Sequence, residues 1–149
     1  MSKNRFLLIL FPLAIIAGHG CKKDVPMYGS APEIKFISVV PSVVTQFKDS
    51  IVFTISYQDG DGDLGQNDPN VNNLFIIDNR INIMYSYRIP QLAPDGAKII
   101  IKGNLTVVLK NTSITDNSFS QLAVYSIYLK DRAGNRSNTV LTSAITVKE

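Results

Sequence analysis

From about residue 33 onward the chain consists of short apolar stretches separated by polar, turn-forming residues. The clearest stretch, 50–57, alternates residue by residue. One face carries Ile51, Phe53, Ile55 and Tyr57, and the other face carries Val52, Thr54 and Ser56. A period of two is typical of a β-strand with one buried face. No later stretch shows the 3.6-residue period of an amphipathic helix, so the pattern indicates an all-β domain.

The same criteria predict seven strands, each bounded by Gly, Pro, Asn or Asp. Their ranges are 33–40, 50–57, 74–77, 81–89, 105–109, 123–129 and 141–147. Since alternation gives each sheet one apolar face, two sheets must pack together to bury both faces. The sequence therefore predicts one antiparallel β-sandwich of the immunoglobulin or fibronectin III type, with about seven strands, over residues 33–149. This length suffices for one such core and is too short for two.

The N-terminal segment differs from the rest of the chain. Lys3 and Arg5 form a short basic start, residues 6–17 are apolar throughout, and small residues follow just before Cys21. These are the three parts of a secretory signal. The apolar stretch is shorter than the roughly 20 residues that a membrane-spanning helix needs. We therefore interpret residues 1–20 as a signal peptide.

Cys21 makes this signal more specific. It is the only cysteine in the chain, so a disulfide within the chain is excluded. Its place resembles that of the acylated cysteine in bacterial lipoprotein signals, with Gly20 directly before it and Gly18 where leucine is usual. Residues 22–32 have the polar, Pro- and Gly-containing composition of a tether. We expect a lipidated tether over 21–32; an ordinary signal peptide with an incidental cysteine, giving a secreted product, is the alternative.

Removing the leader changes the charge of the protein. The formal net charge of +3 includes Lys3 and Arg5, and taking away these two charges leaves +1. A nucleic-acid-binding protein would be expected to show a basic face, and none is evident. The tether keeps Lys22 and Lys23, which either lie near anionic lipid head groups or are solvated linker charges.

The mature chain lacks the residues of the common catalytic systems. The only histidine, His19, lies in the leader, and the only cysteine is the expected anchor. A Ser-His-Asp or Cys-His nucleophile system and the usual zinc site of Cys and His are thus excluded. We expect a protein that is not an enzyme.

The positive candidate for chemistry is an aspartate-rich loop. Asp59, Asp61 and Asp63 alternate with Gly60 and Gly62, which leave the backbone free to curl. Carboxylates this close repel one another unless a cation or solvent screens them, and Ca²⁺ binds several oxygens at once. This spacing predicts a calcium site in the loop.

Topology adds a further ligand to this site. In a meander of hairpin-like connections, alternate loops share one end of the sandwich. The loop 59–73 and the turn 131–136 should then lie together, and Asp131 could complete the site, with Asp68 or backbone carbonyls adding ligands. The alternative is a metal-free loop, because Asp-Gly pairs are preferred turn formers and Arg132 and Arg136 could neutralise the aspartates.

The fourth predicted strand carries an aromatic pair. Alternation places Tyr85 and Tyr87 on one face and Met84 on the other. Tyrosine and methionine are enriched in binding surfaces. We expect these side chains to pack in the core or at a sheet edge, with a binding surface as the alternative.

Two motifs carry a resemblance to a known family. The segment SYQDGDGDLGQND (56–68) resembles the D-G-D-G-D-L-G loop of small Ig-like lipoproteins of Bacteroidetes-type bacteria. The segment YSIYLKDRAGNRSNTV (125–140) is similar to the closing hairpin of bacterial Ig-like domains. Together with Cys21, the resemblance spans nearly the whole chain. It implies a fold and an envelope location, and no general activity.

These observations lead to one favoured function and two alternatives. The favoured one is a non-enzymatic lipoprotein of the cell envelope, at the outer membrane, held there by its lipid. Its Ig-like domain would present loops to a protein or glycan ligand. Surface-exported members of the family carry acidic residues after the cysteine, and Lys22-Lys23-Asp24 leaves the periplasmic and surface faces both open. The alternatives are a structural calcium-binding spacer and a carbohydrate-binding accessory domain, whose exposed aromatics Tyr85 and Tyr87 would have to supply.

Overall fold

The computed structural model describes residues 28–149, so the leader and Cys21 lie outside the described residues. Residues 28–149 contain no helix with the length and apolar character that crossing a bilayer requires. They form strands joined by turns and loops. The strands are β1 (Glu33–Val40), β2 (Val43–Thr45), β3 (Ile51–Asp59), β4 (Leu74–Asp78), β5 (Ile83–Tyr87), β6 (Ile101–Leu109), β7 (Ser120–Ala123), β8 (Tyr125–Leu129), β9 (Val140–Leu141) and β10 (Ile145–Lys148).

The expectation of an all-β, sandwich-like fold is confirmed, and the differences lie in individual strands. The stretch predicted at 123–129 is divided between β7 and β8 at Val124, and the last predicted strand is divided into β9 and β10. The short strand β2 was not predicted, because three residues are too few to show alternation. It pairs with β10 in parallel, so the fold is not purely antiparallel.

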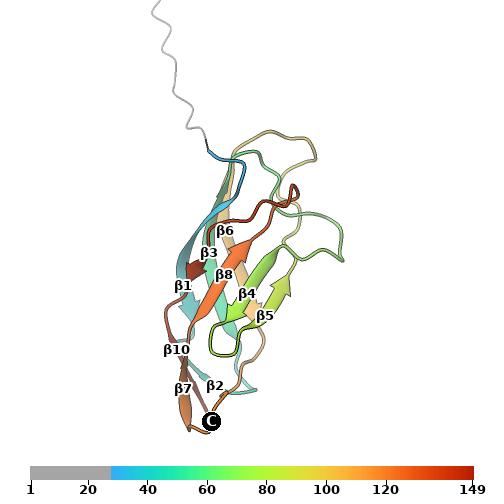
Figure 1. The fold of residues 1–149 in the computed structure, drawn as a ribbon. Coiled ribbons are helices and arrows are strands. Elements are labelled where there is room, and N and C mark those ends of the chain that lie inside the picture. Colours follow the sequence, from blue (N-terminus) through green and yellow to red (C-terminus); the bar gives the residue numbers. More distant parts are fainter. Residues whose placement is uncertain (1–27) are drawn as a thin grey trace, which may run out of the picture.

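The strands form three sheets. The first has the order β1-β3-β6, the second β5-β4-β8-β9, and the third β2-β10-β7. Because β7 continues into β8 and β9 leads into β10, the third sheet extends the second toward the lower end of the domain in Figure 1. The first sheet lies against this layer, so two layers enclose one core, an arrangement compatible with an Ig-like sandwich.

The core is built from the inward faces of the two layers. The Phe53 ring of β3 meets the Tyr125 ring of β8 edge-on, with the centroids 5.1 Å apart and the planes at 68°. Tyr125 is fully buried, and its hydroxyl lies 3.1 Å from Oγ1 of Thr112, so its polar end is satisfied. The other fully buried large side chains are Ile34, Ile51, Ile55, Leu64, Ile76, Ile127, Leu129, Ile145, Val44 and Val147.

The two ends of the domain differ in what they hold (Figure 1). The described chain enters at the upper end, where β3 ends, β6 begins and the connections before β4, β6 and β9 lie. Glu149 lies at the lower end. The loop 60–73 and the turn after β8 therefore share the upper end, as the sequence predicted.

A buried ion pair fastens the lower part of the sandwich. Asp78, at the end of β4, is 1% exposed and accepts hydrogen bonds from Nε (2.9 Å) and Nη2 (2.6 Å) of Arg80. Arg80 also donates to the carbonyl oxygen of Ser113 (3.0 Å), to Oε1 of Gln121 (2.8 Å) and to Oγ1 of Thr112 (2.9 Å). One guanidinium thus joins the β4–β5 turn to the long connection before β7.

Replacing Arg80 by methionine should destabilise the domain strongly. The change leaves the Asp78 carboxylate buried without its cation, which costs about 3–5 kcal/mol in comparable cases. The exposed Arg88 donates only to the carbonyl oxygen of Gln66 and provides the matched control. Arg88→Met should change the unfolding free energy by about 0.5 kcal/mol or less. Urea unfolding of both variants measures this, and equal stability of the two would contradict the assigned role.

Candidate metal centre

The regular alternation of β3 brings a carboxylate into the interior. Ile51, Phe53 and Ile55 face the core and are fully buried, and Tyr57 follows on the same face. Two residues further, Asp59 takes the next inward position and is 1% exposed. It is paired with Ile101 of β6, so its backbone belongs to the sheet. The alternation of β3 that places Ile51, Phe53 and Ile55 in the core therefore also buries Asp59.

Three aspartates converge at this point, and we call Asp59, Asp61 and Asp63 the aspartate cluster. One carboxylate oxygen from each lies within 4.8 Å of the other two. Oδ2 of Asp59 accepts the Leu64 amide (3.0 Å), and Oδ2 of Asp63 accepts the Ala133 amide (3.1 Å). The Oδ1 atoms of all three are buried and have no hydrogen-bond partner. Buried polar atoms are nearly always paired, so three such oxygens in one place favour a bound cation.

Two glycines allow the loop to fold this tightly. Gly62 has φ +76° and Gly65 has φ +78°, a left-handed conformation that suits residues without a Cβ. A Cβ at Gly62 would lie 2.6 Å from the carbonyl oxygen of Ile99, and one at Gly65 would collide with the carbonyl oxygen of Pro90. The loop after β3 is therefore packed directly on the connection between β5 and β6.

Asp131 lies beside the cluster and has its own partners. The Arg132 amide donates to the Asp63 carbonyl oxygen (3.2 Å), which brings the turn after β8 against the aspartate loop. Oδ1 of Asp131 accepts the Asn135 amide (2.7 Å), and Oδ2 accepts the Asn135 side-chain amide (2.9 Å). Both oxygens of Asp131 thus close its own turn. The structure brings Asp59, Asp61 and Asp63 together, and Asp131 is not among the carboxylates that lie within 4.8 Å of one another.

The two nearby arginines bind elsewhere. Nη1 of Arg132 donates to the Gly65 carbonyl oxygen (2.7 Å), and its Nε lies 3.7 Å from a carboxylate oxygen of Asp95. The guanidinium of Arg136 lies 3.8 Å from the centre of the Tyr128 ring. Within residues 28–149, no ion pair joins either arginine to the aspartate cluster. Arg132 lies close enough to lower the pKa of Asp63, but it does not neutralise the cluster.

The electrostatics of the cluster agree with this geometry. Burial raises the pKa of Asp59 to about 6, and the neighbouring Asp61 and Asp63 add to the rise, while the Leu64 amide opposes it. The pKa of Asp63 is raised as well, chiefly by burial and then by the charges of Asp131 and Asp61. Crowded carboxylates with raised pKa values gain most from a bound cation.

The donor set fits a hard cation. Ca²⁺ takes six to eight oxygen ligands in flexible geometry, whereas zinc and other borderline metals favour nitrogen and sulfur. The cluster offers three carboxylates, and the carbonyl oxygens of Tyr28 and Gly29 lie against Gly60 of the same loop. Water can supply ligands that the protein does not. The arrangement can therefore hold a calcium ion that rigidifies the upper end.

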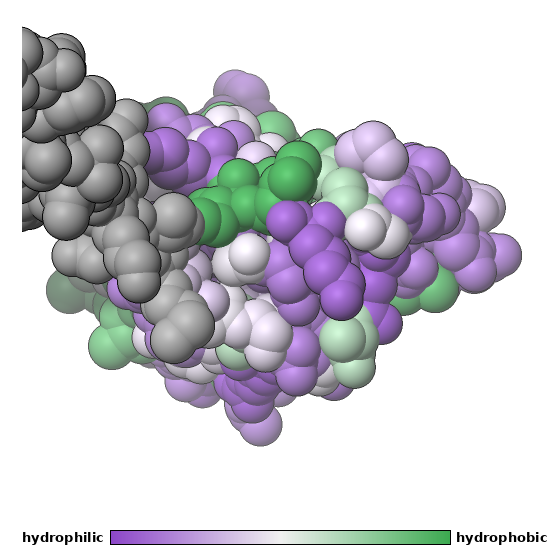
Figure 2. Space-filling model, turned by 90° about the horizontal axis from the view of Figure 1, so that it is seen from above, coloured by the Kyte–Doolittle hydropathy of each residue, from purple (hydrophilic) through white to green (hydrophobic). Residues whose placement is uncertain are grey.

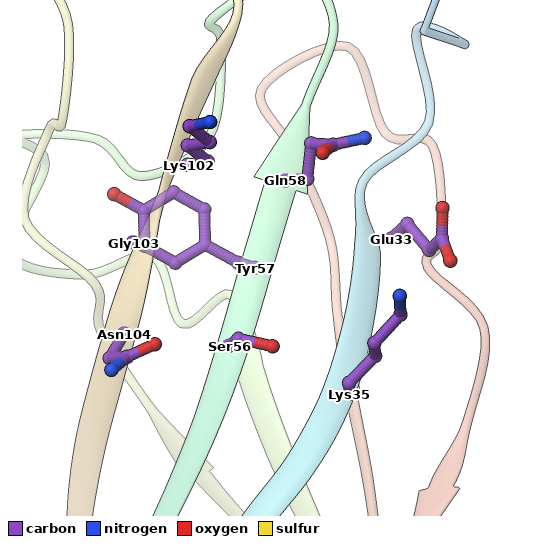
Figure 3. Close-up of a pocket in the computed structure, with 8 residues that line it drawn as sticks. All are labelled: Glu33, Lys35, Ser56, Tyr57, Gln58, Lys102, Gly103 and Asn104. Carbon is purple, nitrogen blue, oxygen red and sulfur yellow. The ribbon is translucent and has the colours of Figure 1, made fainter.

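A polar depression of about 350 Å³ lies on the outer face of the first sheet (Figure 3). Lys35 of β1 and Lys102 and Asn104 of β6 stand on either side of the short Ser56 on the middle strand β3. The remaining lining residues are Glu33, Tyr57, Gln58 and Gly103.

The tyrosines of β5 face inward. Tyr85 and Tyr87 are half-buried and pack against the core, and burial raises the pKa of each hydroxyl. Met84, on the opposite face, is 54% exposed. This confirms the expectation that the tyrosines pack in the core or at a sheet edge. Tyr87 also borders a groove of about 260 Å³ between the β5 end and β6, lined with Leu74, Arg88, Ile89, Pro90, Leu105, Thr106, Val107 and Val108.

Calcium should stabilise the protein through the aspartate cluster. At a calcium concentration a hundred times the dissociation constant, binding adds about 2.7 kcal/mol, which corresponds to a rise in melting temperature of roughly 10 °C for a domain of this size. Asp59→Asn should abolish the rise, and Asp95→Asn, a change at an exposed site of the same end, should retain it. Thermal melts with calcium and with chelator measure this; an unchanged melting temperature in the native protein would rule out the site.

The metal-free domain should lose stability as the pH rises from about 4 to 6. The folded-state pKa of Asp59, about 6, lies above its ordinary value of 3.8, so the folded state binds the proton more tightly than the unfolded state. The resulting stabilisation is complete below the ordinary value and disappears as the pH passes the folded-state value. With about 1.4 kcal/mol per pKa unit, we expect a fall of roughly 1–3 kcal/mol in chelator. Denaturant unfolding across this range should show the fall in the native protein and a much smaller one in Asp59→Asn.

Comparisons with family models, curated proteins and solved structures found no match for this chain.

Proposed function

We propose that this protein is a non-enzymatic lipoprotein of the cell envelope whose β-sandwich serves as an interaction or accessory module, stabilised by calcium at the end nearest its lipid anchor. The observation that carries the proposal is the aspartate cluster, with three buried carboxylate oxygens that lack partners. It lies where the described chain enters the domain. A cation there would stiffen the part of the domain that joins the tether.

The sequence supports the anchor and the lack of catalysis. Cys21 follows a basic and apolar leader at the place where lipoprotein signals carry their acylated cysteine. After it the chain has no histidine and no further cysteine. The resemblance to small Ig-like lipoproteins of Bacteroidetes-type bacteria points to the same location. The outer membrane is the proposed site, with its periplasmic and surface faces both compatible.

The lower end of the domain supports an interaction role. Phe47 is 71% exposed and Phe119 is 81% exposed, and both lie beyond the strands of the third sheet. Phe47 holds this position with φ +59°, a strained conformation for an aromatic residue. Exposed aromatic side chains are typical of the centres of protein interfaces. With the lipid at the upper end, these side chains would face away from the membrane.

The structure agrees better with one of the two alternative functions than with the other. A calcium-binding spacer would use the same aspartate cluster as the interaction module. It would bind no protein or glycan, so the exposed aromatic side chains at the lower end would have no role. A carbohydrate-binding domain would need exposed aromatics from Tyr85 and Tyr87, and both pack against the core instead. We therefore favour the interaction module.

Acylation at Cys21 is the direct test of the anchor. Mass spectrometry of the membrane fraction should show a mature N-terminus at Cys21 with added acyl mass. Cys21→Ser should release the protein from the membrane fraction without changing its calcium-dependent melting temperature, since the metal centre lies in the folded domain. A mature N-terminus at Cys21 without acyl mass would end the lipoprotein proposal and leave the metal centre intact.

A further inference from the structure

Three segments meet at the upper end of the domain. The carbonyl oxygen of Tyr28 would lie 2.7 Å from a Cβ at Gly60, and that of Ile99 lies 2.6 Å from the corresponding position at Gly62. The first described residues, the aspartate loop and the connection before β6 are therefore in direct contact. An anchor attached upstream of Tyr28 would therefore keep the upper end of the domain close to it.

This end exposes apolar side chains next to basic ones. Ile99 is 51% exposed, Ile100 is 40% exposed and Tyr28 is 39% exposed; we call these three residues the proximal patch. Lys98 and Lys102, both exposed, lie on either side of the run Ile99, Ile100 and Ile101 in sequence. Figure 2 views the domain from this end and shows a hydrophobic area with hydrophilic side chains beside it. Exposed isoleucines just before a strand, with exposed lysines close by in sequence, form a pattern suited to a lipid surface.

The length of the chain brings the patch within reach of a membrane. Tyr28 lies seven residue steps after Cys21, with six residues between them, and a fully extended chain spans at most about 3.6 Å per step. A lipid on Cys21 would therefore keep Tyr28 within about 25 Å of the bilayer surface. At such a distance even weak contacts are favoured, because the anchor supplies a high effective concentration.

We propose that the proximal patch docks on the anionic lipid bilayer and orients the domain with its upper end toward the membrane. The proposal rests on the lipid anchor proposed above. The isoleucine side chains enter the boundary between head groups and acyl chains, and Lys98 and Lys102 face the anionic head groups. The aspartate cluster lies next to Ile99, and bound calcium would remove the repulsion between its carboxylates and these head groups.

Site-specific labelling tests the docking in the full acylated chain. Because Cys21 is the only native cysteine and acylation consumes its thiol, an added cysteine is the sole thiol open to labelling. Ile100→Cys carries a polarity-sensitive fluorophore in the patch, and Leu122→Cys, at a site 66% exposed near the lower end, is the matched control. Both labelled variants are inserted into vesicles of phosphatidylethanolamine and phosphatidylglycerol in a calcium-containing buffer. A fraction of these lipids carries a spin label in the acyl chain, which quenches a fluorophore that enters the bilayer.

We expect quenching and a blue-shifted emission at position 100 and neither change at position 122. Lys98→Gln and Lys102→Gln should lower the docked-to-free ratio at position 100 by about fivefold for each lysine removed. Equal lack of quenching at both positions, with the acyl mass present, would overturn the docking and leave the anchor intact. A burial of position 100 that persists without vesicles would also overturn it, since a second copy or a protein would then cover the patch. A chain without acyl mass at Cys21 would overturn both proposals.

Discussion

The inward face of β3 is the constraint on which the core and the metal centre both depend. Ile51, Phe53 and Ile55 occupy it and pack against the opposite layer, where Phe53 meets Tyr125. A regular strand cannot expose one of these side chains without exposing the others, because successive side chains point to opposite faces of the sheet. Asp59 therefore enters the interior at the end of the row, and the hydrophobic contacts upstream oppose its escape to water.

A buried carboxylate needs compensation, and the domain compensates its two buried aspartates on β3 and β4 in different ways. Asp78 receives the Arg80 guanidinium, which also binds the connection before β7. Asp59 receives one backbone amide and is left beside two further carboxylates. Within the described part of the chain no cation approaches the cluster as Arg80 approaches Asp78. Arg80 supplies the partner at the lower end, and the proposed calcium ion would supply it at the upper end.

In the proposed function the two ends of the sandwich have different roles. The upper end brings together the first described residues, the aspartate loop and the connection before β6, so a cation bound there would transmit force from an anchor into the sheets through β3. The lower end is stabilised without a metal and carries exposed aromatics such as Phe119. A domain anchored at one end and exposed at the other would suit the proposed interaction module.

The sequence by itself determined the elements and the identity of the three clustered aspartates. Alternation is a local property, and it is strong over 50–57, so the strand and its inward face could be predicted. The burial of Asp59 could also have been read from the same alternation, carried two residues beyond Tyr57. Only the tertiary structure decided that Asp131 closes its own turn with Asn135 and that Arg132 binds the Gly65 carbonyl oxygen. These outcomes depend on hydrogen bonds between segments far apart in the chain or on the exact shape of a turn, and neither leaves a periodic signal. The strand β2 was missed for a related reason, because its three residues are fixed by pairing with β10 and not by any pattern of their own.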